Sequence, residues 1–110
     1  MTTTIQFSAQ IQPQQVKDIA KQGFKTLINN RPDGEEANQP HNADIEQAAK
    51  EAGLAYKAIL FAGGQLTQTQ VEEFAKFYNQ SDKPVLMFCR TGNRSNMLYQ
   101  TAEQMDLLDD

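Results

Sequence analysis

A continuous apolar run, PVLMF at residues 84–88, is the feature that most constrains the fold. Because apolar and polar side chains do not alternate in it, we expect a strand that is buried on both faces. Strands of that kind occur mainly in parallel sheets with helices packed on either side. A chain of 110 residues is long enough to bury such a core. We therefore predict one α/β domain over residues 1–110, with a mostly parallel central sheet and helices on both faces.

The rest of the chain alternates short β-prone runs with helical patterns. Strands are predicted at Ile5–Ser8, at Phe24–Asn29, within Leu54–Leu60 and at Pro84–Phe88. Helices are predicted at Pro13–Gln22, at Asp44–Ala52, after a cap at Thr67, and over Ser95–Met105. Residues 30–42 form the longest irregular segment. Ligands in such sheets bind outside the carboxyl ends of the strands. This irregular segment and Cys89 each come directly after the carboxyl end of a predicted strand.

Composition excludes several classes of function. A single cysteine forms no intrachain disulfide, and with His41 as the sole histidine it makes no multi-cysteine zinc site. The net charge of −4 argues against a broad nucleic-acid surface, and no apolar run could cross a membrane. The first residues lack the pattern of a secretory signal, so a cytoplasmic location is expected. No cofactor or metal is expected.

The one cysteine lies in the string CRTGNRS, residues 89–95, which we call the cysteine loop. A strand, a tight loop and a helix N-terminus together favour an anion, because backbone N–H groups and the helix dipole point at it. Gly92 allows a backbone conformation that a side chain would oppose. Arg94 can offer a planar fork to an oxyanion, and Ser95 can donate to the sulfur or accept from helix amides.

A lone cysteine is commonly a buried, inert thiol. The glycine, the two arginines and the change from strand to helix favour a nucleophilic thiolate instead. The predicted catalytic residues are Cys89 and Arg94. The predicted substrate-binding residues are Arg90, Thr91, Gly92, Asn93, Ser95 and, from the long irregular segment, Arg31. Asp33 and Glu35 of that segment could supply a general acid, although a solvated turn is favoured for them.

The cysteine loop resembles the active-site loop of single-domain rhodaneses, whose cysteine carries a persulfide. Upstream, GFKTLINNRPDGEE and YKAILFAGGQLTQTQVEEF resemble dual-specificity phosphatases. The combination, from about Ile5 to Met105, resembles the phosphatase-like domain of bacterial beta-lactamase-hydrolase-like proteins. That resemblance implies a dual-specificity-phosphatase-like fold. It also implies a possible metallo-hydrolase partner, because the family includes stand-alone chains and domains fused to a metallo-hydrolase.

Two departures from the phosphatase pattern bear on the reaction. Four residues separate Cys89 from Arg94, where tyrosine-phosphatase-like enzymes have five. Residues 62–66, where such enzymes place an aspartic acid, contain no carboxylate. Positioned acid catalysis is worth about 10²–10⁴-fold to ester hydrolysis.

Sulfur transfer needs no such acid, so the leading prediction is a sulfurtransferase that takes sulfur from a small anionic donor and passes it to a thiol acceptor. The alternatives are a phosphatase acting through phosphocysteine on a phosphate ester and a non-catalytic anion- or protein-binding module.

Overall fold

The computed structural model of the chain describes residues 4–109. Its strands are β1 (Ile5–Ser8), β2 (Thr26–Asn29), β3 (Ala55–Ala58) and β4 (Val85–Phe88). Its helices are a 3-10 turn at Pro13–Gln15, α1 (Val16–Lys21), α2 (Asn42–Glu51), α3 (Gln68–Gln80) and α4 (Asn93–Gln104). The predicted alternation of strands and helices is therefore confirmed.

The four strands form one sheet in the order β1-β4-β2-β3, and all three pairings are parallel. Within it β4 is hydrogen-bonded on both sides, with Val85 opposite Ile5 of β1 and Thr26 of β2. Every residue of β2 and β4 is buried. The apolar run at residues 84–88 thus forms a central strand covered on both faces, as predicted.

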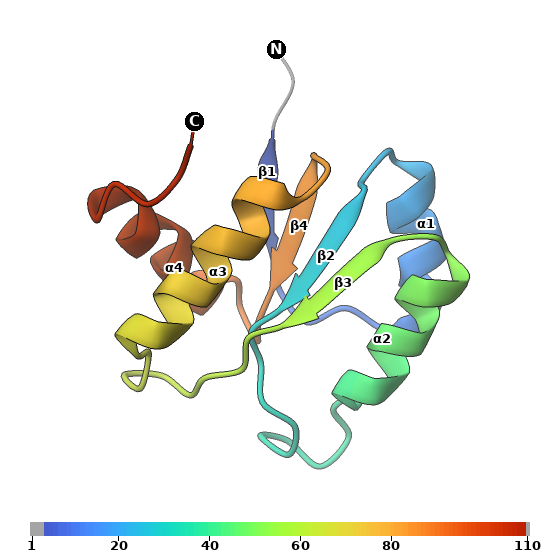
Figure 1. Cartoon of the computed structure of the whole chain (residues 1–110). Coiled ribbons are helices and arrows are strands. Elements are labelled where there is room, and N and C mark those ends of the chain that lie inside the picture. The colour runs from blue at the N-terminus through green and yellow to red at the C-terminus, as the bar shows by residue number, and fades with distance from the viewer. Residues whose placement is uncertain (1–3, 110) are drawn as a thin grey trace.

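Helices cover both faces of the sheet, with α3 and α4 on one side and α1 and α2 on the other (Figure 1). Alternate side chains of β2 and β4 point to opposite faces. Ile28 and Met87 pack with the helices α3 and α4, around Phe74 and Leu98. On the other face a second cluster forms around α1 and α2; its members from the two central strands are Leu27, Leu86 and Phe88.

Helix boundaries differ from the prediction where local contacts decide them. The segment predicted as one helix at Pro13–Gln22 begins as a 3-10 turn. Helix α2 begins at Asn42 rather than Asp44, because Asp33 Oδ1 accepts from the Asn42 backbone N–H at 2.7 Å. Thr67 caps α3 as predicted, accepting from the Gln70 N–H at 3.2 Å.

All four strands point toward one edge of the sheet, at the lower centre of Figure 1. The segment after β2, the segment after β3 and the cysteine loop after β4 leave the sheet at this edge. Three stretches far apart in the sequence are therefore brought together where a ligand is expected. Among residues 4–109 no helix has the length and hydropathy to cross a membrane.

Candidate active site

Cys89 is the first residue after β4 and is completely buried. Its sulfur accepts a hydrogen bond from the Gly92 backbone N–H at 3.1 Å. Burial by itself would raise the pKa of the thiol. The backbone N–H groups of Ser95, Thr91, Gly92 and Arg94 together outweigh burial, and the pKa of Cys89 lies below its ordinary value. The cysteine loop therefore favours a thiolate.

Alkylation by iodoacetamide should show this directly. We expect the rate to rise with pH around a midpoint below about 8.5, the value of a free thiol, because the loop N–H groups stabilise the ionised sulfur. Since the chain has one cysteine, the label reports on Cys89 alone. A midpoint at or above the free-thiol value would contradict a stabilised thiolate.

Gly92 brings the cysteine loop against the end of β1. Its backbone has φ of +97°, in the left-handed region, and it stands at the N-cap position of α4. A Cβ atom at this position would lie 3.3 Å from the carbonyl oxygen of Ser8. That carbonyl also accepts from the Cys89 N–H at 3.3 Å. Both the turn and the close approach thus require glycine.

Arg94 reaches over the mouth of the site from the first turn of α4. Its Nη1 donates to Glu35 Oε2 at 2.8 Å and to the carbonyl oxygen of Phe61 at 3.0 Å, and its Nη2 donates to Glu35 Oε1 at 2.9 Å. The hydrogen bonds to Glu35 raise the pKa of Arg94, and the nearby Cys89 adds to this effect. Arg94 is therefore a fixed cation beside the sulfur.

Arg31 lies next to this pair but is bound by protein groups. It is 2% exposed, and it donates to Glu35 at 2.9 Å, to Glu36 at 2.6 Å and to Gln10 at 3.1 Å. These contacts engage all three of its nitrogens. The side chain borders the site, where the sequence predicted it, but its hydrogen bonds hold the segment after β2.

Asp33, Glu35 and Glu36 lie on the exposed turn that the sequence favoured, but their carboxylates are also bound by other protein groups. Hydrogen bonds from Arg94, and then from Arg31, lower the pKa of Glu35 to about 2 against the opposing effect of burial. The pKa of Glu36 is also lowered, mainly by its hydrogen bond from Arg31. Both side chains are ionised at neutral pH. Asp33 is used to cap α2.

The remaining predicted binding residues form the outer rim of the cysteine loop. The side chain of Arg90 is 64% exposed, and its Nε lies 3.7 Å from Glu36 Oε1. Thr91 and Asn93 are exposed, and the Thr91 hydroxyl oxygen accepts from the Asn93 N–H at 3.2 Å. This last contact stabilises the turn. Of the three, Arg90 is the one that carries a charge, and its exposed side chain is available to an incoming anion despite the long ion pair with Glu36.

Asn30 supports the site from below, although no sequence pattern indicated this role. It is fully buried, and its Nδ2 donates to the carbonyl oxygen of Ile59 at 2.9 Å. Its Oδ1 accepts from the hydroxyl of Ser95 at 2.8 Å. The Ser95 hydroxyl therefore donates to Asn30 and not to the sulfur, one of the two roles predicted for it. Asn30 ties the start of α4 to the ends of β2 and β3.

Replacing Asn30 with leucine should destabilise the protein. The change leaves the Ser95 hydroxyl and the Ile59 carbonyl buried without their partner, and each such group costs on the order of 1–3 kcal/mol. Urea unfolding would measure the loss. Thr101→Val is a suitable control, because it removes an exposed hydroxyl of α4 that donates to its own helix. A surface substitution of that kind should change the free energy of unfolding by no more than about 0.5 kcal/mol. Equal losses in the two variants would argue against the support that Asn30 gives.

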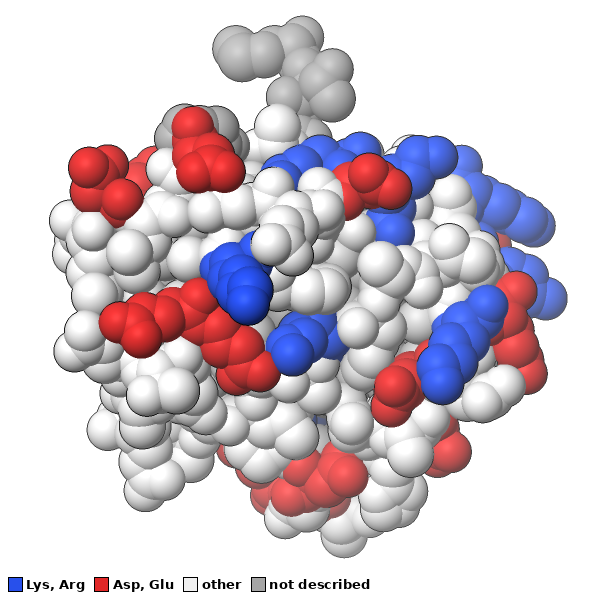
Figure 2. Space-filling model, viewed as in Figure 1, with Lys and Arg blue, Asp and Glu red and all other residues white. Residues whose placement is uncertain are grey.

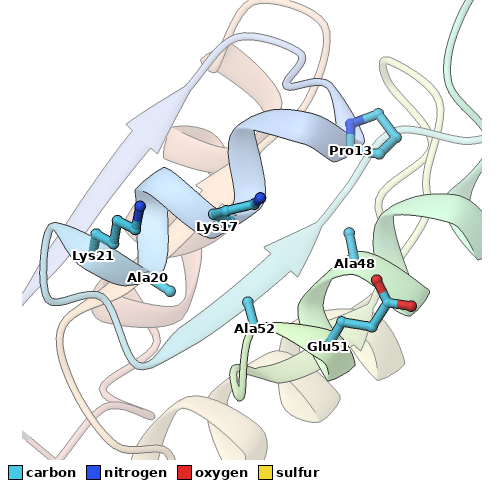
Figure 3. A pocket seen from close by; sticks show the side chains of 7 residues that line it. All are labelled: Pro13, Lys17, Ala20, Lys21, Ala48, Glu51 and Ala52. Atoms are coloured by element: carbon cyan, nitrogen blue, oxygen red, sulfur yellow. The ribbon is translucent and has the colours of Figure 1, made fainter.

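A hollow of about 450 Å³ opens where the segment after β2 faces the cysteine loop. The residues that line it, which we call the mouth, are Arg31, Glu35, Glu36, Gly63, Arg90 and Arg94. Another hollow, of about 430 Å³, lies between α1 and α2 (Figure 3). Alanines and two lysines line much of it, and no nucleophile is among its residues. The mouth is therefore the candidate site.

Charges of both signs are present on the face shown in Figure 2, with Lys and Arg gathered toward the upper right, near α1 in Figure 1. The mouth itself combines three arginines with two glutamates. Among residues 4–109, no three His, Cys, Asp or Glu side chains gather closely enough to hold a metal ion.

Sequence comparison places this arrangement in a family. A sequence model described as "Beta-lactamase hydrolase-like protein, phosphatase-like domain" matches residues 1–105. The chain belongs to that family. Beta-lactamase hydrolase-like proteins of Xylella fastidiosa and Agrobacterium fabrum are each 38% identical to it, over 81% and 80% of its length. The chain spans only about a fifth of the length of these relatives, at 21% and 20%.

Solved structures support the phosphatase-like fold of the family. A crystal structure of a "putative phosphatase" from Neisseria meningitidis is 34% identical, with a TM-score of 0.80, and the match covers 89% of this chain and 70% of the other. The core catalytic domain of the PP-IP phosphatase SIW14 from S. cerevisiae, solved with citrate, is 11% identical. Its TM-score is 0.61, and the match covers 92% of this chain and 70% of the other. At so low an identity, this match shows only that the two proteins share a fold. The family match and the structure from Neisseria meningitidis favour the phosphatase alternative over sulfurtransfer.

Proposed function

We propose that this phosphatase-like domain transfers sulfane sulfur through a persulfide on Cys89. The observation that carries the proposal is a stabilised thiolate at a mouth whose carboxylates have no proton to give. Four backbone N–H groups lower the pKa of Cys89, and the arginines above it lower the pKa of Glu35 and Glu36. Such a site supplies a nucleophile and positive charge, but no acid.

The need for an acid separates the two reactions. Hydrolysis of an alkyl phosphate expels an alkoxide, which requires a proton in the transition state. Glu35, with a pKa of about 2 caused first by Arg94, is ionised at neutral pH. Sulfur transfer from thiosulfate expels sulfite, a stable anion that needs no proton. The mouth therefore suits the sulfur reaction better.

The proposed reaction has two balanced steps. The Cys89 thiolate attacks the outer sulfur of thiosulfate, a Cys–S–S⁻ persulfide forms, and the bond to the inner sulfur breaks with release of sulfite. An acceptor thiolate then attacks the outer sulfur of the persulfide, takes it away and regenerates the Cys89 thiolate. The N–H groups of the cysteine loop and Arg94 lie near the Cys89 sulfur, and we expect them to stabilise the negative charge on the terminal sulfur of the persulfide.

Phosphate ester hydrolysis through phosphocysteine is the second candidate. The family description and the matching crystal structures support it. The same N–H groups and the same arginine would hold a phosphoryl group, and an aryl ester, whose leaving group is a weak base, would relax the need for an acid. A metallo-hydrolase partner stays a prediction; the length of the relatives is compatible with it, since the matched segment is only 21% and 20% of their length.

Mass spectrometry of the intact protein separates the candidates. We expect incubation with thiosulfate to add the mass of one sulfur atom, and incubation with an aryl phosphate to add nothing and release little phenol. Cys89→Ser should react with neither compound. A phosphoryl adduct with rapid phenol release, and no sulfur adduct, would replace the proposal with the phosphatase. If neither compound reacts with the wild-type protein, the anion- or protein-binding module becomes the better description.

A further inference from the structure

Glu35 contacts two arginines at once. Its Oε1 accepts from Arg31 Nε at 2.9 Å and from Arg94 Nη2 at 2.9 Å, while its Oε2 accepts from Arg94 Nη1 at 2.8 Å. The carboxylate thus accepts hydrogen bonds from both terminal nitrogens of Arg94, one at each of its oxygens. Such bidentate pairs fix orientation as well as adding energy.

The contacts of Arg94 leave one edge of its guanidinium unused by the protein backbone and carboxylates. The group has five N–H bonds in one plane. Glu35 and the Phe61 carbonyl take two from Nη1, and Glu35 takes one from Nη2. The Nε–H and the second Nη2–H, which lie on the same edge, remain. Cys89 lies close enough to Arg94 to raise the pKa of the guanidinium, and this edge is the one left available for the sulfur or for an anion bound there.

We propose that Glu35 is a positioning residue, which holds Arg94 so that its Nε–Nη2 edge faces an anion at Cys89. This inference rests on the proposed function in that it assumes chemistry at Cys89, whichever group is transferred. Arg31 in turn holds Glu35 in place. It is buried and hydrogen-bonded to Gln10 and Glu36, and its Nε donates to Glu35. Arg31 therefore acts on the anion only through Glu35.

The charge of Glu35 and its positioning role act in opposite directions on an incoming anion. As a charge, the carboxylate repels the anion, so removing it should speed the approach of an anionic reagent. As a positioning residue, it directs two N–H groups of Arg94 at that reagent, so removing it should slow the reaction. The sign of the effect therefore distinguishes the two roles.

The test compares two alkylating agents of similar size, anionic iodoacetate and neutral iodoacetamide, at a pH where Cys89 is ionised. The measured quantity is the ratio of their rates. We expect Glu35→Gln to lower this ratio about 10-fold, because the amide cannot accept from both Nη atoms of Arg94 and the oriented edge is lost. General damage to the cysteine loop would slow both reagents alike and leave the ratio unchanged.

Glu36→Gln is the matched control, since Glu36 is the next residue, also binds Arg31, and has no contact with Arg94 among the interactions of residues 4–109. It should raise the ratio slightly, because it removes a repelling charge, while an amide oxygen can still accept from Arg31 and the contacts between Glu35 and Arg94 stay in place. Glu35→Asp keeps the charge on a shorter side chain and should lower the ratio, which covers the case in which Glu35→Gln fails to fold.

A ratio that stays the same or rises in both Glu35 variants would overturn the positioning role. The test is independent of sulfurtransfer, because alkylation requires neither thiosulfate nor a phosphate ester. The absence of a sulfur adduct in the wild-type protein would count against the proposed function and leave the role of Glu35 standing.

Discussion

Insertion of one glycine between Gly92 and Asn93 is expected to slow the transfer of sulfur from thiosulfate to Cys89 by about 10²–10³-fold. In the native loop, the N–H groups of Thr91, Gly92, Arg94 and Ser95 converge on one sulfur atom. An added residue widens the loop and turns these donors away from the position where the terminal sulfur becomes negative. The rate of persulfide formation, followed by mass spectrometry, measures the loss.

The widened loop has the spacing of tyrosine-phosphatase-like enzymes, so hydrolysis of an activated aryl phosphate should rise above the wild-type level. The double variant with Cys89→Ser should lack both activities, which ties any new hydrolysis to the cysteine. If the native protein already hydrolyses aryl phosphates efficiently and accepts no sulfur, loop length does not decide the reaction. The phosphatase would then be the function of this site.

Replacement of Gly92 with alanine should also have a large effect. The new side chain must adopt φ near +97°, at a cost of about 1–3 kcal/mol, and its Cβ would press on the Ser8 carbonyl at 3.3 Å. Because that carbonyl binds the Cys89 N–H, we expect the strain to move the loop and slow sulfur transfer about 10²-fold. Urea unfolding and the persulfide assay would measure the two losses.

Gly53→Ala separates backbone strain from the close approach. Gly53 also has a positive φ, +80°, but nothing lies within 4 Å of its added Cβ. This variant should lose stability alone, while Gly92→Ala should also shift the alkylation midpoint of Cys89 upward. Similar activity in the two variants would mean that the contact with Ser8 has no role in shaping the loop.

Local pattern was enough to predict most of the fold. The apolar run before Cys89 identified the central strand, because a strand without polar alternation has no face for water. Thr67 correctly predicted the start of α3, because the cap is a contact with Gln70, only three residues further along the chain. The predicted boundaries failed where a cap came from a distant residue, as Asp33 does for α2.

The supporting contacts of the site lay beyond such reasoning. Glu35 meets Arg94 across 59 residues, and Asn30 meets Ser95 across 65. Nothing near Asn30 in the sequence distinguishes it from an ordinary residue at a strand end. The sequence predicted that Arg31 binds the substrate anion. Its burial and its hydrogen bonds to protein groups could not be foreseen, because they depend on the three-dimensional structure. The cysteine loop could be recognised because its donors are contiguous.

The reaction is harder to infer than the fold. Family membership and the structure from Neisseria meningitidis favour the phosphatase alternative that the sequence left open, whereas the sulfurtransferase that the sequence favoured stays a proposal. Both reactions use a thiolate, an arginine and a ring of N–H groups. They differ in whether a proton reaches the leaving group, and that depends on how a few carboxylates are paired.

The parallel arrangement of the sheet also determines how this domain can be joined to other polypeptides. Since every strand runs toward the cysteine, β1 begins at the far edge, and α4 runs back from Gly92 toward that edge (Figure 1). A tag, a linker or a neighbouring domain attached before Ile5 or after Gln104 would therefore leave from the side opposite the mouth. Fusion at either end therefore leaves the mouth uncovered for small reagents and for a thiol presented by another protein.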